Sequence, residues 1–302
     1  MNPLRDWNDF WFRPVNVSNL GLFRIAIGLV VLLKLFLLFQ IWEDCFSHKG
    51  LVSLTDSLKW IPAPRIGLLD ALPDQAIPIF FAMLFLVTLC FVLGWMTRWM
   101  TVVLFLGLIS LDNRNPWILN SGDTLLSILI FYSIFAPLDA RYSLDRWKAR
   151  IRGKVKECPA LESPWAMRLM QFQICVMYFW SAYIKIHGGA WESGEAVYWT
   201  YHNVECARFP IPFLTNSMPG INFLTHFTIL AEGLFPFLVW SKYTRGYILL
   251  AGILLHLGIE WSMNIQIFEY VALSAYLLFL DGEETAKFMS NSRQKLLTSF
   301  VV

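Results

Sequence analysis

The ionisable side chains that interrupt the apolar stretches of this sequence are its best candidates for chemistry. They are Arg24, Lys34, Asp123, Lys185, His226, Glu232, His256, Glu260 and Glu269. Charged groups are costly inside a bilayer, so those that occur there usually face the interior of a helix bundle and mark a functional site. The sequence therefore predicts a polar site inside an otherwise apolar protein.

Several of these side chains have more than one interpretation. Lys185 lies at a predicted helix end, where a lysine often extends to the lipid headgroups. His256 and Glu260 are four residues apart, a spacing compatible with a metal, but the sequence has no HEXXH motif and no cysteine ligands nearby. Hydrogen bonds to other helices are therefore favoured over a metal site. Glu232 is either paired with an arginine or part of a proton relay.

The composition places these residues in a membrane protein. Of 302 residues, 57% are hydrophobic and 15% are charged, and the mean hydropathy is +0.52. Soluble proteins carry about 25% charged residues. The 14 Trp, 10 Tyr and 25 Phe are typical of proteins with aromatic belts at the membrane interfaces. The net charge of +2 is small and favours no nucleic-acid partner.

The apolar runs predict an all-α, polytopic bundle of about eight transmembrane helices. A bilayer core about 30 Å thick needs roughly 20 apolar residues in a helix. The candidate spans are residues 20–42, 77–96, 98–112, 117–136, 166–186, 222–240, 245–262 and 265–281. We expect residues 1–302 to form a single transmembrane domain, with a basic loop at 137–164 and a short tail at 282–302.

The Lys and Arg residues of the connections predict the orientation. With the N-terminus inside, the inner segments carry fifteen of them and the outer loops carry five. Cytoplasmic loops are enriched in these residues, so both termini and the loop at 137–164 are expected in the cytoplasm. As a basic amphipathic helix, this loop is expected to lie on anionic membrane lipids, and a docking site for a cytosolic protein is the alternative.

This orientation brings many polar candidates to the outer side of the membrane. Asp123, Lys185, His256, Glu260 and Tyr270 fall in the outer parts of their predicted spans. An outward-facing polar cavity is the most economical explanation.

The cysteines are few and none forms a CxxC motif, which disfavours a thiol-disulfide or zinc-ribbon function. Cys45 and Cys206 fall in the two large outer loops. They form a disulfide if that side is oxidising and if they approach each other, and two unrelated thiols are the alternative.

Four motifs carry a resemblance to a known family. The stretch CVMYFWSAYIKIHGGAWESGEAVYW resembles the helix of the active lysine in vitamin K-dependent gamma-carboxylases and in the bacterial HTTM (horizontally transferred transmembrane) domain proteins. Its matching positions are Ser181, Ala182, Lys185, Trp191 and Gly194. HLGIEWSMNIQIFEY resembles the histidine-containing helix, NRNPWILNSGDTLLSIL the Asn-x-Gly-Asp helix start, and LGLFRIAIGLVVL the first helix. The similarity covers about residues 20–281.

The resemblance implies a membrane enzyme in which a lysine base acts on a lipid-soluble, quinone-like substrate. It implies that Lys185 takes a proton from a reduced, vitamin K-like quinone, and that His256, Asn120 and Asp123 complete the catalytic site. Burial favours the neutral amine that such a base requires. The side chains expected to contact the substrate are Trp180, Tyr183, Trp191, Glu260 and Tyr270. The bacterial relatives imply a location in the inner membrane.

Two departures from the carboxylases bear on the activity. The carboxylases have Asn-His where this sequence has Asn120 and Asp123, and they carry a large lumenal domain after the helices, whereas this sequence stops at Val302. We therefore expect a separate partner to present any peptide or protein substrate on the outer side. A non-catalytic maturation or assembly factor that acts with a partner protein is the alternative. A transporter is disfavoured because the two halves show no symmetry.

The predicted topology is tested by labelling single cysteines with a membrane-impermeant reagent, in a background without the five native cysteines. Cysteines placed in the loops at 43–76 and 187–221 should react in intact cells. A cysteine at Arg150 should react only after permeabilisation, because the 137–164 loop carries more of the inner basic residues than any other segment. Labelling of position 150 from outside would reverse the orientation.

Overall fold

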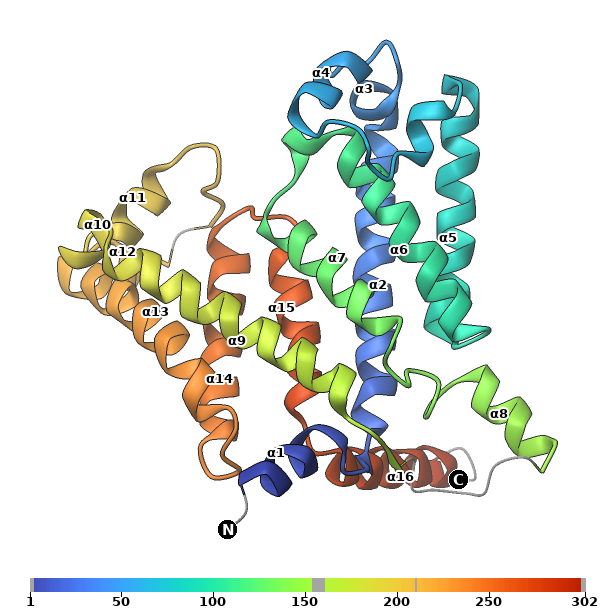
Figure 1. The fold of residues 1–302 in the computed structure, drawn as a ribbon. Helices are drawn as coiled ribbons and strands as arrows, with labels where there is room; N and C mark the ends of the chain where they lie inside the picture. The colour runs from blue at the N-terminus through green and yellow to red at the C-terminus, as the bar shows by residue number, and fades with distance from the viewer. Residues whose placement is uncertain (1–2, 154–160, 210, 300–302) are drawn as a thin grey trace. The chain divides into compact units, whose positions relative to one another are not determined.

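The computed structural model describes residues 3–153, 161–209 and 211–299, which are mostly helical (Figure 1). The chain forms two compact units. Unit 1 comprises residues 1–169 and 280–302, and unit 2 comprises residues 170–279. Helix α9 (Trp165–Ile186) begins in unit 1 and continues into unit 2.

Unit 1 is built around a long apolar helix. Its helices are α1 (Pro3–Phe12), α2 (Ser18–Gln40), α3 (Trp42–Phe46), α4 (Leu54–Trp60), α5 (Ile77–Leu93), α6 (Thr97–Arg114), α7 (Ser121–Ser133), α8 (Leu144–Ile151) and α16 (Gly282–Ser299), with short 3-10 turns at Leu68–Ala71, Asp74–Ala76 and Pro116–Ile118. Helix α2 packs against α5 and α16, α5 against α6, and α6 against α7. Apolar side chains such as Phe23, Leu35, Phe81 and Leu104 are fully buried between them.

Unit 2 consists of the remainder of α9 and the helices that follow it. These are α10 (Gly189–Glu192), α11 (Ala196–His202), α12 (Pro212–Thr215), α13 (Met218–Leu238), α14 (Arg245–Ser262) and α15 (Phe268–Tyr276), which a 3-10 turn extends over Leu277–Phe279. Helix α14 packs against both α13 and α15. The short helices α11 and α12 pack against α13.

Each of the eight predicted spans contains a helix, but the predicted number of about eight helices is wrong. The described residues form sixteen α-helices, because the connections and both ends of the chain are helical too. Within the described ranges, three helices are long and apolar enough to cross a membrane: Ser18–Gln40, Asp74–Leu93 and Met218–Leu238. The others are short or carry charged and polar residues; α7, with 13 residues, is only about 20 Å long. Hydropathy detects apolar runs and misses short helices in polar connections.

One small sheet departs from the all-α expectation. Strands β1 (Val15–Asn16) and β2 (Leu161–Glu162) pair antiparallel, with Val15 opposite Glu162. The pairing ties the segment before α2 to the segment before α9.

The basic loop predicted at 137–164 contains helix α8. Ser143 caps this helix, because its hydroxyl accepts a hydrogen bond of 2.9 Å from the backbone N–H of Arg146. Trp147 and Ile151 are exposed on α8 beside its basic residues. Residues 154–160 lie outside the described residues. The lipid-binding role of this loop stays a prediction.

Arg24 anchors the start of the same loop to α2. The side chain is fully buried, and its guanidinium donates hydrogen bonds to the carbonyl oxygens of Leu138 at 2.7 Å and Tyr142 at 2.5 Å. A buried charge is tolerated only when such partners replace water. Arg24 therefore has a structural role.

Asp145 joins α8 to the start of α6. Its carboxylate accepts hydrogen bonds from the backbone N–H groups of Met96 at 3.0 Å and Thr97 at 2.9 Å. Met96 has a φ of 48°, in the left-handed region that is unfavourable for a residue other than glycine. Asp145 thus satisfies donors that the helix leaves unpaired and stabilises a strained turn.

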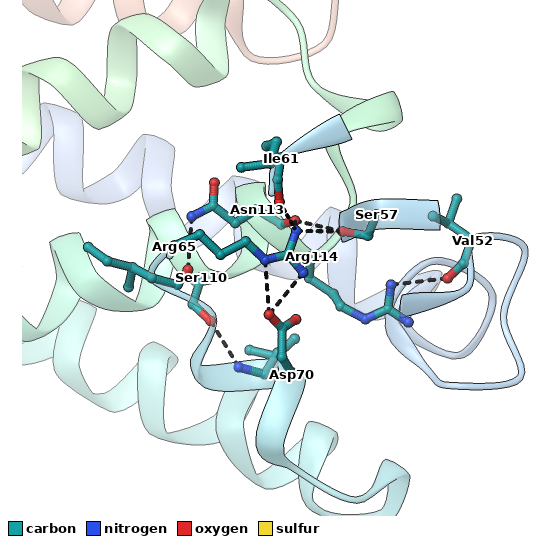
Figure 2. A network of polar contacts seen from close by, with 10 residues as sticks. Val52, Ser57, Ile61, Arg65, Asp70, Ser110, Asn113 and Arg114 are labelled. Carbon is teal, nitrogen blue, oxygen red and sulfur yellow. Dashed lines mark hydrogen bonds and ion pairs between the residues drawn. The ribbon is translucent and has the colours of Figure 1, made fainter. Parts of the chain in front are cut away.

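Between α3 and α5, a connection of unit 1 is also held by buried arginines (Figure 2). The Arg65 guanidinium lies 2.9 Å from an Asp70 carboxylate oxygen and 2.8 Å from the carbonyl oxygen of Asn113. Arg114, which is 1% exposed, donates hydrogen bonds to the carbonyl oxygens of Val52 and Ser47. These bonds fix the connection to the end of α6.

Replacing Asp145 tests how far its bonds stabilise unit 1. We expect Asp145→Ala to lower the free energy of unfolding by about 1–2 kcal/mol, the usual cost of removing a helix cap. Asp145→Asn should cost less, because the amide oxygen still accepts one hydrogen bond. The measurement is thermal unfolding in detergent, followed by the fluorescence of the 14 tryptophans. Asp6→Ala, at an exposed acid of α1, is the control, and an equal midpoint for all variants would contradict this role.

Candidate functional site

Lys185 and Glu232 form an ion pair within unit 2. The Nζ atom of Lys185 lies 2.6 Å from each carboxylate oxygen of Glu232 and 2.7 Å from Oγ of Ser181. Lys185 comes from the end of α9 and Glu232 from the middle of α13, so the pair joins two helices. The side chain of Lys185 is 18% exposed and that of Glu232 is 8% exposed. The pair is largely desolvated but remains open at the amine.

An aromatic ring lies beside this pair. The Lys185 Nζ atom is 5.1 Å from the ring centroid of Trp191, within the range of a cation–π interaction. Trp191 belongs to α10, immediately after the turn that ends α9. The structure therefore brings together the predicted base and one predicted substrate contact.

Two other predicted substrate contacts lie elsewhere on α9. Trp180 and Tyr183 stack on each other with centroids 5.4 Å apart, and both rings are largely exposed. Helical geometry places them on the face opposite Lys185. Their role in substrate binding stays a prediction, and contact with lipid acyl chains suits their exposure equally.

A second polar cluster of unit 2 surrounds His256. Its Nδ1 atom is hydrogen-bonded to the Glu269 carboxylate and its Nε2 atom to the Tyr178 hydroxyl. The Tyr178 hydroxyl also lies 2.6 Å from the Tyr276 hydroxyl. All four side chains are buried, and they come from α14, α15 and α9. Both ring nitrogens of His256 are thus engaged by partners on other helices.

The two clusters adjoin each other in unit 2. Tyr178 precedes Lys185 by seven residues, two helical turns, so both lie on one face of α9. On α13, Phe235 follows Glu232 by three residues, and its ring packs 4.4 Å from that of Tyr178 and 5.4 Å from that of Tyr276. Unit 2 therefore holds two polar clusters with the ring of Phe235 between them.

Glu260 and Tyr270, the remaining predicted substrate contacts, bind each other. The Tyr270 hydroxyl donates a 2.8 Å hydrogen bond to Oε1 of Glu260, which also accepts one of 3.0 Å from Arg208. Glu260 therefore does not pair with His256, four residues earlier on the same helix. His256 and Glu260 both form hydrogen bonds with residues of other helices or connections, which is the arrangement that the sequence favoured.

Asn120 and Asp123 lie in unit 1, where they form the capping box of α7. Oδ1 of Asn120 accepts hydrogen bonds from the backbone N–H groups of Gly122 and Asp123, while Oδ2 of Asp123 accepts one from the N–H of Asn120. Lys185 and His256 belong to unit 2. A single site built from all four residues therefore stays a prediction.

Asp123 also belongs to a buried ion network. The Lys34 Nζ atom lies 2.8 Å from Oδ1 of Asp112 and 2.9 Å from Oδ1 of Asp123. Ser127 donates a 2.8 Å hydrogen bond to Oδ2 of Asp112. With the Asn120 N–H on Asp123, all four carboxylate oxygens are bonded. The network links α2, α6 and α7, which is a structural role.

The proposed disulfide is not formed in the structure. Cys45 is buried in unit 1, Cys206 is half-buried in unit 2, and both are free thiols. A bridge between them under oxidising conditions stays a prediction.

Sequence analysis missed several members of these clusters. Glu232 and Glu269 were recognised as ionisable groups within apolar stretches but were not assigned to a site. Tyr178 and Tyr276 were not singled out, although Tyr178 shares a helical face with Lys185. That spacing was the signal available for Tyr178. Nothing local marks Tyr276, because only the folded arrangement of α9, α14 and α15 brings it to His256.

Comparison with known proteins gives one family. The model of the HTTM domain matches residues 12–283, which includes residues of both units and confirms the resemblance found in the sequence motifs. No curated protein and no solved structure matches the chain. With its apolar helices, the chain is an integral membrane protein. It belongs to the HTTM domain family, which is related to the gamma-carboxylases.

Proposed function

We propose that this protein is a membrane enzyme that removes a proton from a lipid-soluble, quinol-like substrate, with Lys185 and Glu232 together as the proton acceptor. The observation that carries the proposal is their ion pair, desolvated at the carboxylate and open at the amine. Family membership supports the type of chemistry, because the stretch around Lys185 resembles the active-lysine helix of the related carboxylases. Location in a bacterial inner membrane is part of this proposal.

The ion pair refines the role expected for a lone lysine. A single buried lysine acts as a base only when its neutral form is favoured, whereas an adjacent carboxylate favours the charged form. The Lys185–Glu232 pair nevertheless accepts one proton as a unit. It passes from ammonium and carboxylate to ammonium and carboxylic acid, and its net charge rises from zero to +1. That positive charge lies where the substrate becomes an anion, an arrangement that lowers the barrier for proton removal in a water-poor site.

The surroundings of the pair suit a quinol-like head group. Trp191 offers an aromatic face next to Lys185, and the partly exposed amine leaves one approach open. A reduced quinone supplies an acidic O–H group and the reducing power for later oxygen chemistry. The residues of this protein bind the quinol ring, accept its O–H proton and stabilise the anion that remains. The substrate enters laterally from the bilayer, and a separate protein partner presents any peptide to be modified.

The variants Lys185→Ala, Lys185→Arg and Glu232→Gln test this function. The probe is a menaquinol supplied to the purified protein in lipid nanodiscs with oxygen, and mass spectrometry follows a product that contains one oxygen atom more than the quinone. Lys185→Ala and Glu232→Gln should lose about 100- to 10,000-fold in rate, the usual range for loss of a group that acts in general acid–base catalysis. Lys185→Arg should lose less, because it keeps the positive charge beside Glu232, the group that takes the proton. Lys242→Ala, at an exposed loop lysine, should retain the full rate.

Two outcomes would overturn the enzyme hypothesis. If wild type and Lys185→Ala are equally active, Lys185 is an anchor. The second outcome is that the wild type gives no such product and its lipid extract contains no quinone or other prenyl lipid. In that case the protein is a non-catalytic assembly factor that acts with a partner.

A further inference from the structure

The buried hydrogen bonds of the His256 cluster have a defined direction. If Glu269 is ionised, Nδ1 of His256 carries the proton and donates it to that carboxylate. Nε2 of the same neutral ring is then an acceptor, so Tyr178 donates to it. The Tyr276 hydroxyl in turn donates to the oxygen of Tyr178, 2.6 Å away. Every donor in the chain of four residues points toward Glu269.

Glu269, at one end of this chain of hydrogen bonds, has a carboxylate oxygen that can take up another proton. Oε1 of Glu269 is buried and has no hydrogen-bond partner among the described residues, and the whole residue is 0% exposed. A buried carboxylate oxygen without a partner is costly as an anion. The cost falls when the carboxylate is protonated, so Glu269 is suited to accept a proton.

Tyr276 and Tyr178, at the other end of this chain of hydrogen bonds, lie next to the helix segment that carries Glu232. Phe235, three residues after Glu232, packs on the rings of Tyr178 and Tyr276. Gly252 of α14 leaves the space that the Tyr276 hydroxyl occupies, since a side chain there would overlap it. The Lys185 side chain is 18% exposed, whereas the four hydrogen-bonded residues Tyr276, Tyr178, His256 and Glu269 are at most 4% exposed.

We infer that Tyr276, Tyr178 and His256 form a proton relay that delivers a proton from the Lys185–Glu232 pair to Glu269. Where it takes up the proton of the pair, the relay rests on the proposed function, and Glu269 then holds this proton until it returns along the same hydrogen bonds. As a path for protons from water to Glu269, it is measured without any substrate.

One transfer moves the equivalent of one proton from the Lys185–Glu232 pair to Glu269. The protonated pair gives a proton to the Tyr276 oxygen, either directly or through a water molecule. The Tyr276 proton passes to Tyr178, the Tyr178 proton to Nε2 of His256, and the Nδ1 proton to Oε2 of Glu269. The pair ends with one proton fewer, Glu269 becomes a neutral carboxylic acid, and both tyrosines remain phenols. Concerted transfer avoids a lasting phenolate, which is unfavourable because phenols are far weaker acids than carboxylic acids.

A purely structural cluster has the same bonds, so the test must follow proton movement. The measurement is time-resolved infrared spectroscopy of the purified protein in lipid nanodiscs after a drop in pH, with no quinol present. The infrared band of the Glu269 carboxylic acid is identified as the band that the Glu269→Gln variant lacks. We expect Tyr178→Phe to slow the appearance of this band at least tenfold while its final size is retained, because phenylalanine fills the space but carries no proton. Tyr276→Phe should act in the same way.

The control is Tyr247→Phe, an exposed tyrosine of α14, the helix that carries His256, which should leave the rate unchanged. Nitrogen-15 NMR of the five histidines shows that His256 keeps its Nδ1 proton in each variant, which excludes unfolding as the cause. An unchanged rate in both Tyr178→Phe and Tyr276→Phe would overturn the relay, as would the absence of any Glu269 band. Slowed protonation without quinol turnover would instead support the relay and contradict the enzyme hypothesis.

Discussion

The cost of an unpaired charge in an apolar surrounding shapes this protein more than any other constraint. Transfer of an ion out of water costs several kcal/mol even after relaxation, unless hydrogen bonds or an opposite charge replace the lost water. Buried cations among the described residues of unit 1 have such partners: backbone carbonyls for Arg24 and Arg114, and carboxylates for Lys34. Since these partners come from other helices or connections, meeting the requirement also fixes how the elements pack.

The same constraint separates a structural ion network from a reactive one. In the network of Lys34, all four carboxylate oxygens are bonded and the lysine side chain is 4% exposed, so the network is closed off inside the protein. The pair of Lys185 and Glu232 has one cation for one carboxylate, and its lysine is 18% exposed. The second arrangement combines desolvation with access, which proton transfer to a bound molecule requires. This difference supports the proposal that the chemistry belongs to unit 2.

The limits of sequence analysis follow from the range of the forces involved. Apolar runs located a helix in each predicted span, because burial of a continuous stretch is encoded locally. The number of helices was wrong, since short helices such as α4, which Ser53 caps, lie in polar connections that hydropathy does not detect. The partner of Lys185 lies 47 residues away on another helix, and helical spacing gives no information about it. Glu232 was noted as an acid within a span, but its two proposed roles did not include pairing with a lysine.

Pairing also changes what an active-site lysine must do. The sequence argument needed a neutral amine, because it treated Lys185 as the whole base. With Glu232 2.6 Å away, the proton removed from the substrate can rest on the carboxylate while the ammonium stays charged beside the new anion. The pair then holds an excess positive charge that cannot persist in a desolvated site, so the proton must leave before the next turnover. In the proposed relay, the hydrogen-bonded side chains move that proton to Glu269, the carboxylate bonded to His256, and Glu269 holds it while the pair returns to zero net charge. The ion pair and the relay are therefore two parts of one solution to the same electrostatic problem.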